Sequence, residues 1–261
     1  MTQVWERGDP YEAYVGRWSR LVARELLDWL AVPPGRDWLD VGSGTGALAS
    51  TILAAAAPAS VTGVDPAEGF VAHARSAVPD ATFVVGDAQH LPFEDDSFDA
   101  VVSGLVLNFV ADPALAVGEM RRVARPGAAV AAYVWDYAGR MELMRWFWDT
   151  AAELDPVARE LDEGRRFRAF ERPENLERLF TDAGHEDVRS RAIDVPTVFR
   201  DFDDYWEPFL GGQGPAPAYA MSLDEKARGR LRELLRERLP AEDDGSISLV
   251  ARAWAVRGSK P

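Results

Sequence analysis

The sequence predicts an α/β protein built on a doubly wound, mostly parallel sheet with helices on both faces. Between residues 37 and 135, short apolar runs alternate with helical patterns, which is the order of βαβ units. Three glycines at every second position follow directly on the first apolar run. Glycines there are typical of a tight turn from a strand into a helix, above which such sheets bind ligands.

The elements follow from the chain in order. An amphipathic helix is expected over Tyr11 to Leu30, because apolar residues recur at intervals of three and four, and Pro33, Pro34 and Gly35 then end it. Strands are expected at residues 37–41, 60–64, 82–85, 98–103 and 128–135, and helices at 47–57, 67–77 and 113–124. A turn is expected at 125–127, Arg-Pro-Gly, before the fifth of these parallel strands.

Beyond residue 136 the pattern becomes helical and rich in aromatic residues. Helices are expected at 141–161 and 173–183, and strands at 188–195 and 247–256, which brings the sheet to seven strands. Residues 199–239 interrupt the last two strands, with a flexible turn in the stretch GGQGPAPAY (211–219) and a charged helix at 223–239. This interruption is predicted to be an insertion.

Composition narrows the class of function. The 261 residues are 47% hydrophobic and 10% aromatic, enough for one large domain with a buried core. The net charge of −14 repels polyanions, so we expect a small-molecule ligand and no nucleic acid. The absence of cysteine excludes disulfides, thiolate metal ligands and cysteine nucleophiles, and no metal is expected.

We also expect a cytoplasmic protein without a membrane partner. No apolar stretch reaches the roughly 18 residues that span a bilayer. The N-terminal sequence MTQVWERGDP lacks the hydrophobic core of a signal peptide. The sequence gives no indication of oligomeric state.

The spacing of the glycines in the stretch DVGSGTGAL distinguishes between two possible kinds of ligand. Gly42, Gly44 and Gly46 form G-x-G-x-G, whereas turns that bind a dinucleotide pyrophosphate use G-x-G-x-x-G. Asp40 lies two residues before the first glycine. An acid there is unfavourable for a pyrophosphate and suits a ligand that carries an ammonium group and a sulfonium.

At these residues the chain resembles the class I S-adenosylmethionine-dependent methyltransferases of the quinone and secondary-metabolite type. The stretch WLDVGSGTGALA is similar to their glycine motif. Three further stretches resemble later family motifs in the same order: VTGVDPAEGF, GDAQHLPFEDDSFDAVVSGLVLNFV and RRVARPGA. The resemblance implies a Rossmann-like fold, S-adenosyl-L-methionine as cofactor, and methyl transfer to a small-molecule acceptor by in-line displacement.

The resemblance also implies roles for individual residues. Asp65, at the end of the second strand, would accept both ribose hydroxyls, and Asp87 with Ala88 would meet the adenine. The candidate cofactor-binding residues are Asp40, Gly42, Ser43, Gly44, Gly46, Asp65, Pro66, Asp87, Ala88, Gln89 and Ser103. Two alternatives stay open, because Asp65 could simply cap the helix that follows it and Asp87 could merely shape a turn.

No catalytic residue is identified, and His90 and Asn108 are the candidates. A base is needed only where the nucleophile must lose a proton. His90 follows the adenine segment and could approach the pocket, but the sequence favours the alternative, a role in a surface loop. The family frequently has a histidine pair after the fourth strand, where this chain has Asn108-Phe109. Asn108 could hydrogen-bond a substrate or cap the helix that follows Asp112.

Large aromatic side chains predict the substrate side of the site. They come from the N-terminal helix and from the segment after the fifth strand, and aromatic residues with polar atoms suit a hydrophobic or aromatic small molecule. The candidates for substrate binding are Tyr11, Tyr14, Arg17, Trp18, Asn108, Trp135 and Trp146. The alternative is that these aromatic side chains only pack.

These expectations describe one methyltransferase domain, 1–261. Its predicted parts are an N-terminal cap helix (1–35), a cofactor-binding core (36–135) and helical insertions on the substrate side (136–186 and 199–240). Two other functions stay open. One is a non-catalytic S-adenosylmethionine-binding protein. The other is a nicotinamide-dependent oxidoreductase, which would need the pyrophosphate fingerprint that is missing here.

Overall fold

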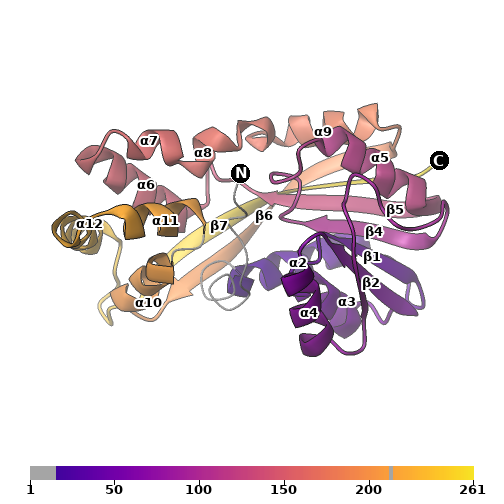
Figure 1. Cartoon of the computed structure of the whole chain (residues 1–261), viewed down its shortest axis with the longest axis horizontal. Helices are drawn as coiled ribbons and strands as arrows, with labels where there is room; N and C mark the ends of the chain where they lie inside the picture. Colours follow the sequence, from indigo (N-terminus) through magenta and orange to yellow (C-terminus); the bar gives the residue numbers. More distant parts are fainter. Residues whose placement is uncertain (1–15, 212–213) are drawn as a thin grey trace. The chain divides into compact units, whose positions relative to one another are not determined.

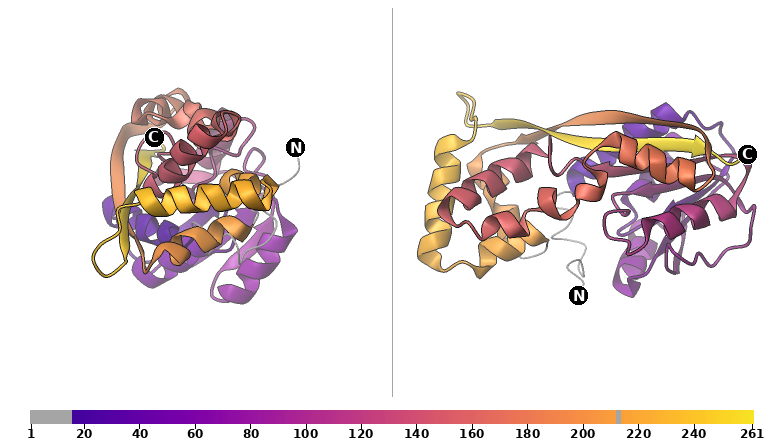
Figure 2. Two further views of the ribbon diagram at one scale, coloured as in Figure 1. Left: turned by 90° about the vertical axis from the view of Figure 1, so that its left-hand side faces the viewer. Right: turned by 90° about the horizontal axis from the view of Figure 1, so that it is seen from above.

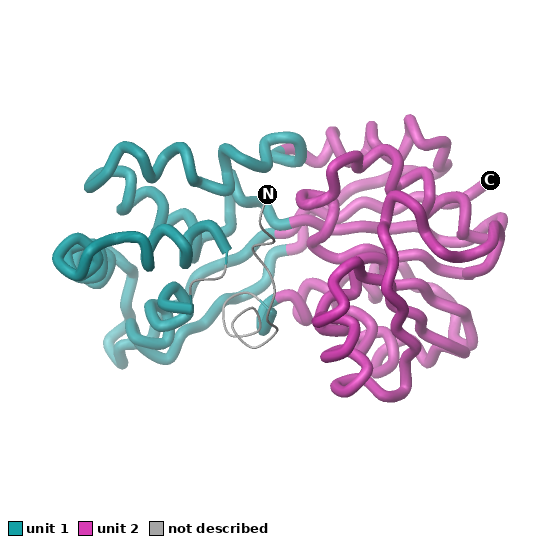
Figure 3. The backbone as a smooth tube through the Cα atoms, in the orientation of Figure 1, with its two compact units in different colours: residues 1–18, 135–171, 194–252 teal, residues 19–134, 172–193, 253–261 magenta. Residues whose placement is uncertain are grey.

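The computed structural model describes residues 16–211 and 214–261. The chain divides into two compact units, coloured separately in Figure 3. Unit 1 holds residues 1–18, 135–171 and 194–252, and unit 2 holds residues 19–134, 172–193 and 253–261. The predicted N-terminal helix is observed as α2, Arg17–Leu30, and the predicted substrate-binding residues Tyr11 and Tyr14 lie outside the described residues.

Seven strands form one sheet in the order β3-β2-β1-β4-β5-β7-β6. The strands are β1 (Asp37–Val41), β2 (Ser60–Asp65), β3 (Thr82–Val85), β4 (Phe98–Gly104), β5 (Ala124–Trp135), β6 (Glu186–Phe199) and β7 (Ile247–Ser259). The first five pair in parallel. β7 runs antiparallel to β5, because Gly127 at the start of β5 bonds to Lys260 while Asp136, just after its end, bonds to Arg252. The predicted seven-stranded, mostly parallel fold is confirmed.

Helices lie on both faces of the sheet in unit 2. They are α2, α3 (Ala47–Ala55), α4 (Glu68–Ala77), α5 (Pro113–Val123) and α9 (Pro173–Asp182). Figure 1 shows α5 and α9 on one face and α2, α3 and α4 on the other. β1 and β4, at the centre of the sheet, are buried on both sides, which suits their continuous apolar runs.

Unit 1 is mainly helical in its described part. Its helices are α6 (Glu142–Leu154), α7 (Ala158–Leu161), α8 (Glu163–Arg166), η2 (Arg168–Phe170), α10 (Phe202–Trp206), η3 (Glu207–Gly211), α11 (Pro215–Ser222) and α12 (Glu225–Arg238). In Figure 2, α11 and α12 are neighbours. Aromatic rings form the core of this unit, where Phe147 stacks on Phe209 with ring centroids 4.5 Å apart.

Two local predictions are wrong. Residues 125–127 belong to β5 and do not form a separate turn, since Gly127 is held in the sheet by its bond to Lys260. The stretch predicted as a flexible turn contains α11, which begins at Pro215. Proline at the first helical position costs no hydrogen bond and has the backbone angle of a helix. The glycine and proline residues of this stretch predict a loop, but Pro215 is instead the first residue of a helix.

Unit 1 also buries an acid. Glu163 is 2% exposed and accepts a hydrogen bond from the indole nitrogen of Trp148. Burial raises the pKa of Glu163 to about 7, opposed by the bond from Trp148. The neighbouring Arg145 is paired with Asp162, at 2.6 Å.

We expect Glu163→Gln to remove a pH dependence of stability. The folded pKa of Glu163 lies above its unfolded value, so its stability contribution is present below about pH 4.5 and is lost as the pH rises through about 7. Relative to Glu163→Gln, the wild-type free energy of unfolding should fall by about 2 to 3 kcal/mol between about pH 4.5 and pH 8. Urea unfolding of both proteins across this range measures the difference. Parallel pH profiles would show that Glu163 has the same pKa in the folded and unfolded states, contrary to the raised value.

Candidate cofactor and active site

The glycine turn between β1 and α3 has a left-handed backbone at every second residue. The φ angles are 76° at Gly42, 51° at Gly44 and 89° at Gly46. Residues other than glycine adopt a left-handed backbone only at a cost in free energy. The turn is anchored to the adjacent strand β2, because the amides of Gly42 and Ser43 both donate to the carbonyl of Val64, at 2.7 and 3.0 Å.

The three glycines differ in what surrounds them. A Cβ atom on Gly42 would lie 2.3 Å from Val106, and one on Gly46 would lie 3.0 Å from Val78. A Cβ atom on Gly44 would meet no atom of the protein within 4 Å. Packing therefore requires Gly42, whereas Gly44 leaves open space at the tip of the turn where a ligand can approach the backbone.

Asp40 is a buried acid with one oxygen unused. It is 1% exposed, and its Oδ2 accepts a hydrogen bond from the amide of Ala49 in α3 at 3.1 Å. Its Oδ1 has no partner in the part of the chain that the structure describes. Burial raises the pKa of Asp40 to about 7, the bond from Ala49 lowers it, and the nearby charge of Asp65 raises it. A buried oxygen without a donor is costly, and a cationic ligand would satisfy it.

Asp65 links the glycine turn to the end of β2. Its Oδ2 accepts from the amide of Gly44 and its Oδ1 from the amide of Ala67, each at 2.9 Å. Burial raises the pKa of Asp65, and these two hydrogen bonds oppose the rise. The contact with the start of the next helix, which was the alternative explanation for Asp65, is therefore present. A carboxylate has about four acceptor positions, so room for further donors remains.

The segment after β3 forms a hydrogen-bonded turn. The carboxylate of Asp87 accepts from the amide of Gln89 at 2.9 Å, and the carbonyl of Asp87 accepts from the amide of His90 at 3.0 Å. The alternative role of Asp87 in shaping a turn is therefore observed. Ala88 is buried, and Gln89 accepts from the amide of Asp112.

The remaining cofactor candidates differ in their hydrogen bonding. Ser103 is buried in β4 and donates to the carbonyl of Val41 at 2.9 Å, which fixes the end of β1. The hydroxyl of Ser43 is buried without a partner in the described chain. Pro66 is exposed. All eleven cofactor candidates belong to unit 2.

The turn after β4 packs against the glycine turn. Leu105 has a left-handed φ of 64° and donates its amide to the carbonyl of Tyr133, and Phe109 donates to the carbonyl of Val106 at 2.8 Å. The Oδ1 atom of Asn108 is buried and has no partner among the described residues. The suggestion that Asn108 caps the next helix is wrong, because Asp112 caps α5 through the amide of Leu115, at 3.0 Å.

Val106 and Leu105 were missed by the sequence analysis. No signal in the sequence identifies a left-handed leucine or pairs Val106 with Gly42, since both features come from packing between two loops. Of the histidines, His90 and His73 are exposed. His185 is buried against Phe180, and burial lowers its pKa to about 4.

The other substrate candidates lie in unit 1. The guanidinium of Arg17 lies over the rings of Trp18 and Phe199, at 4.4 and 4.9 Å, and pairs with Asp204 at 3.2 Å. Trp135 is buried and Trp146 is half-buried. Asn108 belongs to unit 2 with the cofactor candidates. The substrate roles of these residues stay predictions.

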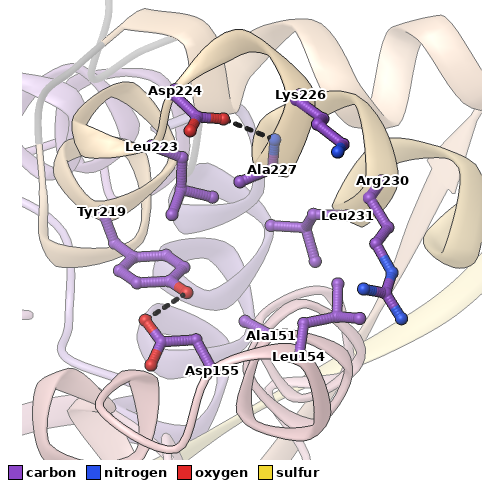
Figure 4. A pocket seen from close by; sticks show the side chains of 10 residues that line it. All are labelled: Ala151, Leu154, Asp155, Tyr219, Leu223, Asp224, Lys226, Ala227, Arg230 and Leu231. Atoms are coloured by element: carbon purple, nitrogen blue, oxygen red, sulfur yellow. Dashed lines mark hydrogen bonds between the residues drawn. The ribbon is translucent and has the colours of Figure 1, made fainter.

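Unit 1 also contains a cavity of about 230 Å³ between α6, α11 and α12 (Figure 4). The residues that line it are Ala151, Leu154, Asp155, Tyr219, Leu223, Asp224, Lys226, Ala227, Arg230 and Leu231. Its two acids are engaged within the chain, since Asp155 accepts from Tyr219 and Asp224 caps α12. None of the sequence-predicted site residues lines this cavity.

No group of three or more histidine, cysteine, aspartate or glutamate side chains among the described residues is arranged to hold a metal ion. No helix in residues 16–211 or 214–261 combines the length and the apolar character that crossing a bilayer requires.

A parallel sheet with a left-handed glycine turn after its first strand and an acid at the end of the next defines an α/β protein that binds a ligand at the carboxyl edge. The model of the family described as "Methyltransferase domain" matches residues 39–132. A demethylmenaquinone methyltransferase of Roseiflexus sp. is 36% identical over 177 residues, which cover 63% of this chain and 74% of that protein.

A demethylmenaquinone methyltransferase of Beutenbergia cavernae is 41% identical over 109 residues, or 42% of this chain and 45% of that protein. The chain spans about half the length of the first curated relatives that it matches. The solved structure of a putative methyltransferase from Bacillus halodurans has a TM-score of 0.60 at 18% identity, covers 92% of this chain and 98% of that one, and supports the fold.

The chain belongs to the class I S-adenosylmethionine-dependent methyltransferases. S-adenosyl-L-methionine is the cofactor of this family. The membership agrees with the resemblance seen in the glycine motif, and it removes the nicotinamide-dependent oxidoreductase from consideration.

We expect Gly42 and Gly44 to respond differently to the same substitution. Gly44→Ala should lower the free energy of unfolding by about 1 to 2 kcal/mol, which is the cost of a left-handed backbone at alanine. Gly42→Ala adds a clash with Val106 and should cost about 1 to 3 kcal/mol more. Urea unfolding of the two variants measures the difference in stability. Equal losses would show that the loop after β4 does not press on Gly42.

Proposed function

We propose that this protein transfers the methyl group of S-adenosylmethionine to a small-molecule acceptor by in-line displacement. The observation that carries the proposal is the buried Oδ1 of Asp40, which lacks a partner in the described chain and lies just before an open glycine turn. A turn of this kind fits a cationic ligand with an amino acid portion. A pyrophosphate would be repelled by the charge of Asp40.

The proposed contacts follow the carboxyl edge of the sheet. Asp40 and the turn at Gly44 bind the ammonium and carboxylate portion of the cofactor. Asp65 accepts the ribose hydroxyls with the acceptor positions left over from its two backbone bonds. The segment Asp87, Ala88 and Gln89 contacts the adenine.

When bound, S-adenosylmethionine supplies an electrophilic methyl group, and the electrons of the broken carbon–sulfur bond stay on sulfur. The residues of the chain bind and orient the cofactor and the acceptor, and they exclude water. Alignment of the reacting groups contributes on the order of 7 to 11 kcal/mol in favourable cases. Ser103 supports this alignment indirectly, because its bond to Val41 fixes the strand from which the glycine turn starts.

The relatives named demethylmenaquinone methyltransferases suggest the first acceptor to test, a naphthohydroquinone. The acidic net charge of −14 favours a neutral or cationic acceptor over a polyanion. Radiolabelled methyl transfer to this acceptor and to other phenols tests the activity. Tight binding of S-adenosylmethionine without turnover on any acceptor would instead favour a non-catalytic binding protein.

We expect Asp65→Ala to weaken S-adenosylmethionine binding at least tenfold. The change removes a charged acceptor, and hydrogen bonds to charged groups contribute about 1.5 to 3 kcal/mol. Isothermal titration calorimetry measures the affinity, and circular dichroism checks the fold, since Asp65 also holds Gly44. Asp80→Ala, at an exposed aspartate before β3, is the matched control. Unchanged affinity in Asp65→Ala would remove Asp65 from the site.

The affinity for S-adenosylmethionine should rise with pH because of Asp40. Its pKa of about 7 means that the ligand-free carboxyl holds a proton below neutral pH, and a cation binds best to the ionised form. We expect a roughly tenfold gain between about pH 5.5 and pH 7 in the wild type. Asp40→Asn keeps an acceptor for Ala49 and should show a flat profile over this range. A wild-type profile that is equally flat would contradict a contact between Asp40 and the cation.

A further inference from the structure

The cavity between α6, α11 and α12 combines an apolar part with charged side chains (Figure 4). Ala151 and Leu231 are buried in its lining, and the ring of Tyr219 is fixed there by contacts with Phe147 and Trp148, at centroid distances of 6.2 and 5.6 Å. The volume of about 230 Å³ is below the usual range of ligand pockets, about 300 to 1,000 Å³. The cavity therefore has room for one ring or a short alkyl chain.

Helix α12, which forms one wall of the cavity, is basic in an acidic chain. Its 14 residues include six basic and three acidic side chains, whereas the whole chain has a net charge of −14. Four of the six basic side chains donate hydrogen bonds within the chain, namely Arg228, Arg232, Arg236 and Arg238. The other two, Lys226 and Arg230, have no hydrogen bond or ion pair in the described chain, and they are the two that line the cavity.

The positions of Lys226 and Arg230 favour joint recognition of one anionic group. They are four residues apart, which places their side chains on the same face of a helix. Figure 4 shows both on one side of the cavity, whereas Tyr219 and Asp155 lie on the other side. An anionic group at the cavity can therefore accept hydrogen bonds from both cations without displacing a partner from either.

The two acids of the lining are already bonded within the chain. The Oδ2 atom of Asp155 accepts from the hydroxyl of Tyr219 at 3.2 Å, and its Oδ1 atom accepts from the amide of Val157 at 3.0 Å. The Oδ1 atom of Asp224 accepts from the amide of Ala227 at 2.7 Å and so caps α12. The lining thus has free donors on its two cations, and a ligand that brings acceptor oxygens fits it best.

We propose that this cavity binds a small amphipathic carboxylate, whose oxygens accept hydrogen bonds from Lys226 and Arg230. The apolar part of the ligand packs on Leu154, Leu223 and Leu231, which line the same cavity. A ligand with one negative charge is expected, because the two acids of the lining repel a polyanion. The inference goes beyond the proposed function and does not depend on it, since the cavity belongs to unit 1 and the cofactor candidates belong to unit 2.

The test compares three ligands that share one ring and differ in charge. Isothermal titration calorimetry measures the binding of phenylpropanoate, phenylpropanamide and phenylpropylamine at about pH 7, where the acid is ionised and the amine is protonated. We expect the wild type to bind the carboxylate about tenfold or more tightly than the neutral amide, and the amine no better than the amide. Added salt should weaken binding of the carboxylate, because both cations are exposed.

Two changes in the protein test the two parts of the site. The double variant Lys226→Gln, Arg230→Gln should lose the preference for the carboxylate over the amide. Its matched control is Arg232→Gln, Arg236→Gln, which removes the same charge from the same helix outside the cavity lining and should keep the preference. Ala227→Phe, at an exposed residue of the lining, should fill the cavity and weaken binding of the carboxylate at least tenfold. Circular dichroism checks the fold of each variant.

Several outcomes would overturn the inference. They are no binding of phenylpropanoate by the wild type, equal binding of the amide, or tighter binding of the amine. A preference that survives loss of Lys226 and Arg230, or that the control variant loses equally, would also contradict it, as would unchanged binding in Ala227→Phe. The proposed function is tested separately by S-adenosylmethionine binding and methyl transfer, which depend on residues of unit 2.

Discussion

The left-handed backbone between β1 and α3 is the constraint on which the site depends. Three positive φ angles in five residues bend the chain sharply enough to bring α3 back over the end of β1. Neighbouring groups hold the bend, since Val64 and Asp65 accept its amides and Val106 closes against Gly42. Of the three glycines in the bend, only Gly44 has open space where a Cβ atom would lie.

Hydrogen bonding divides the polar residues at the sheet edge into two groups. Ser103 and Asp87 are satisfied within the chain, and they fix the ends of strands and turns. Asp40, Ser43 and Asn108 each keep one buried polar atom without a partner in the described residues. Ligand binding that satisfies such atoms stabilises the folded state by mass action. In the proposed function, Asp40, Ser43 and Asn108 face the ligands, whereas Ser103 and Asp87 hold the strand ends and turns in place.

The sequence predicted the fold well because the signal was local. Alternating apolar runs and the glycine spacing gave five parallel strands, and every helix between them, to within a few residues. The errors came where one residue type has two uses, as with Pro215, which was taken as part of a loop and in fact begins α11. For the candidate site, the motif predicted Asp40, Asp65 and the glycines, because they lie close together along the chain, and their contacts with a cofactor stay predictions. It could not identify Val106, whose importance arises from a contact with Gly42 more than sixty residues away in sequence.

Two buried acids show why a raised pKa alone does not locate a site. Burial raises the pKa of both Asp40 and Glu163 to about 7. Glu163 accepts a bond from Trp148, and neither of its oxygens is a buried atom lacking a partner in the described chain. It is a polar contact within the aromatic core of unit 1. Asp40 has the same shift but keeps a free oxygen beside a turn with open space. Glu163 has a hydrogen-bond donor inside the fold, whereas the Oδ1 atom of Asp40 has none among the described residues, and in the proposed function the cation of the cofactor supplies the partner.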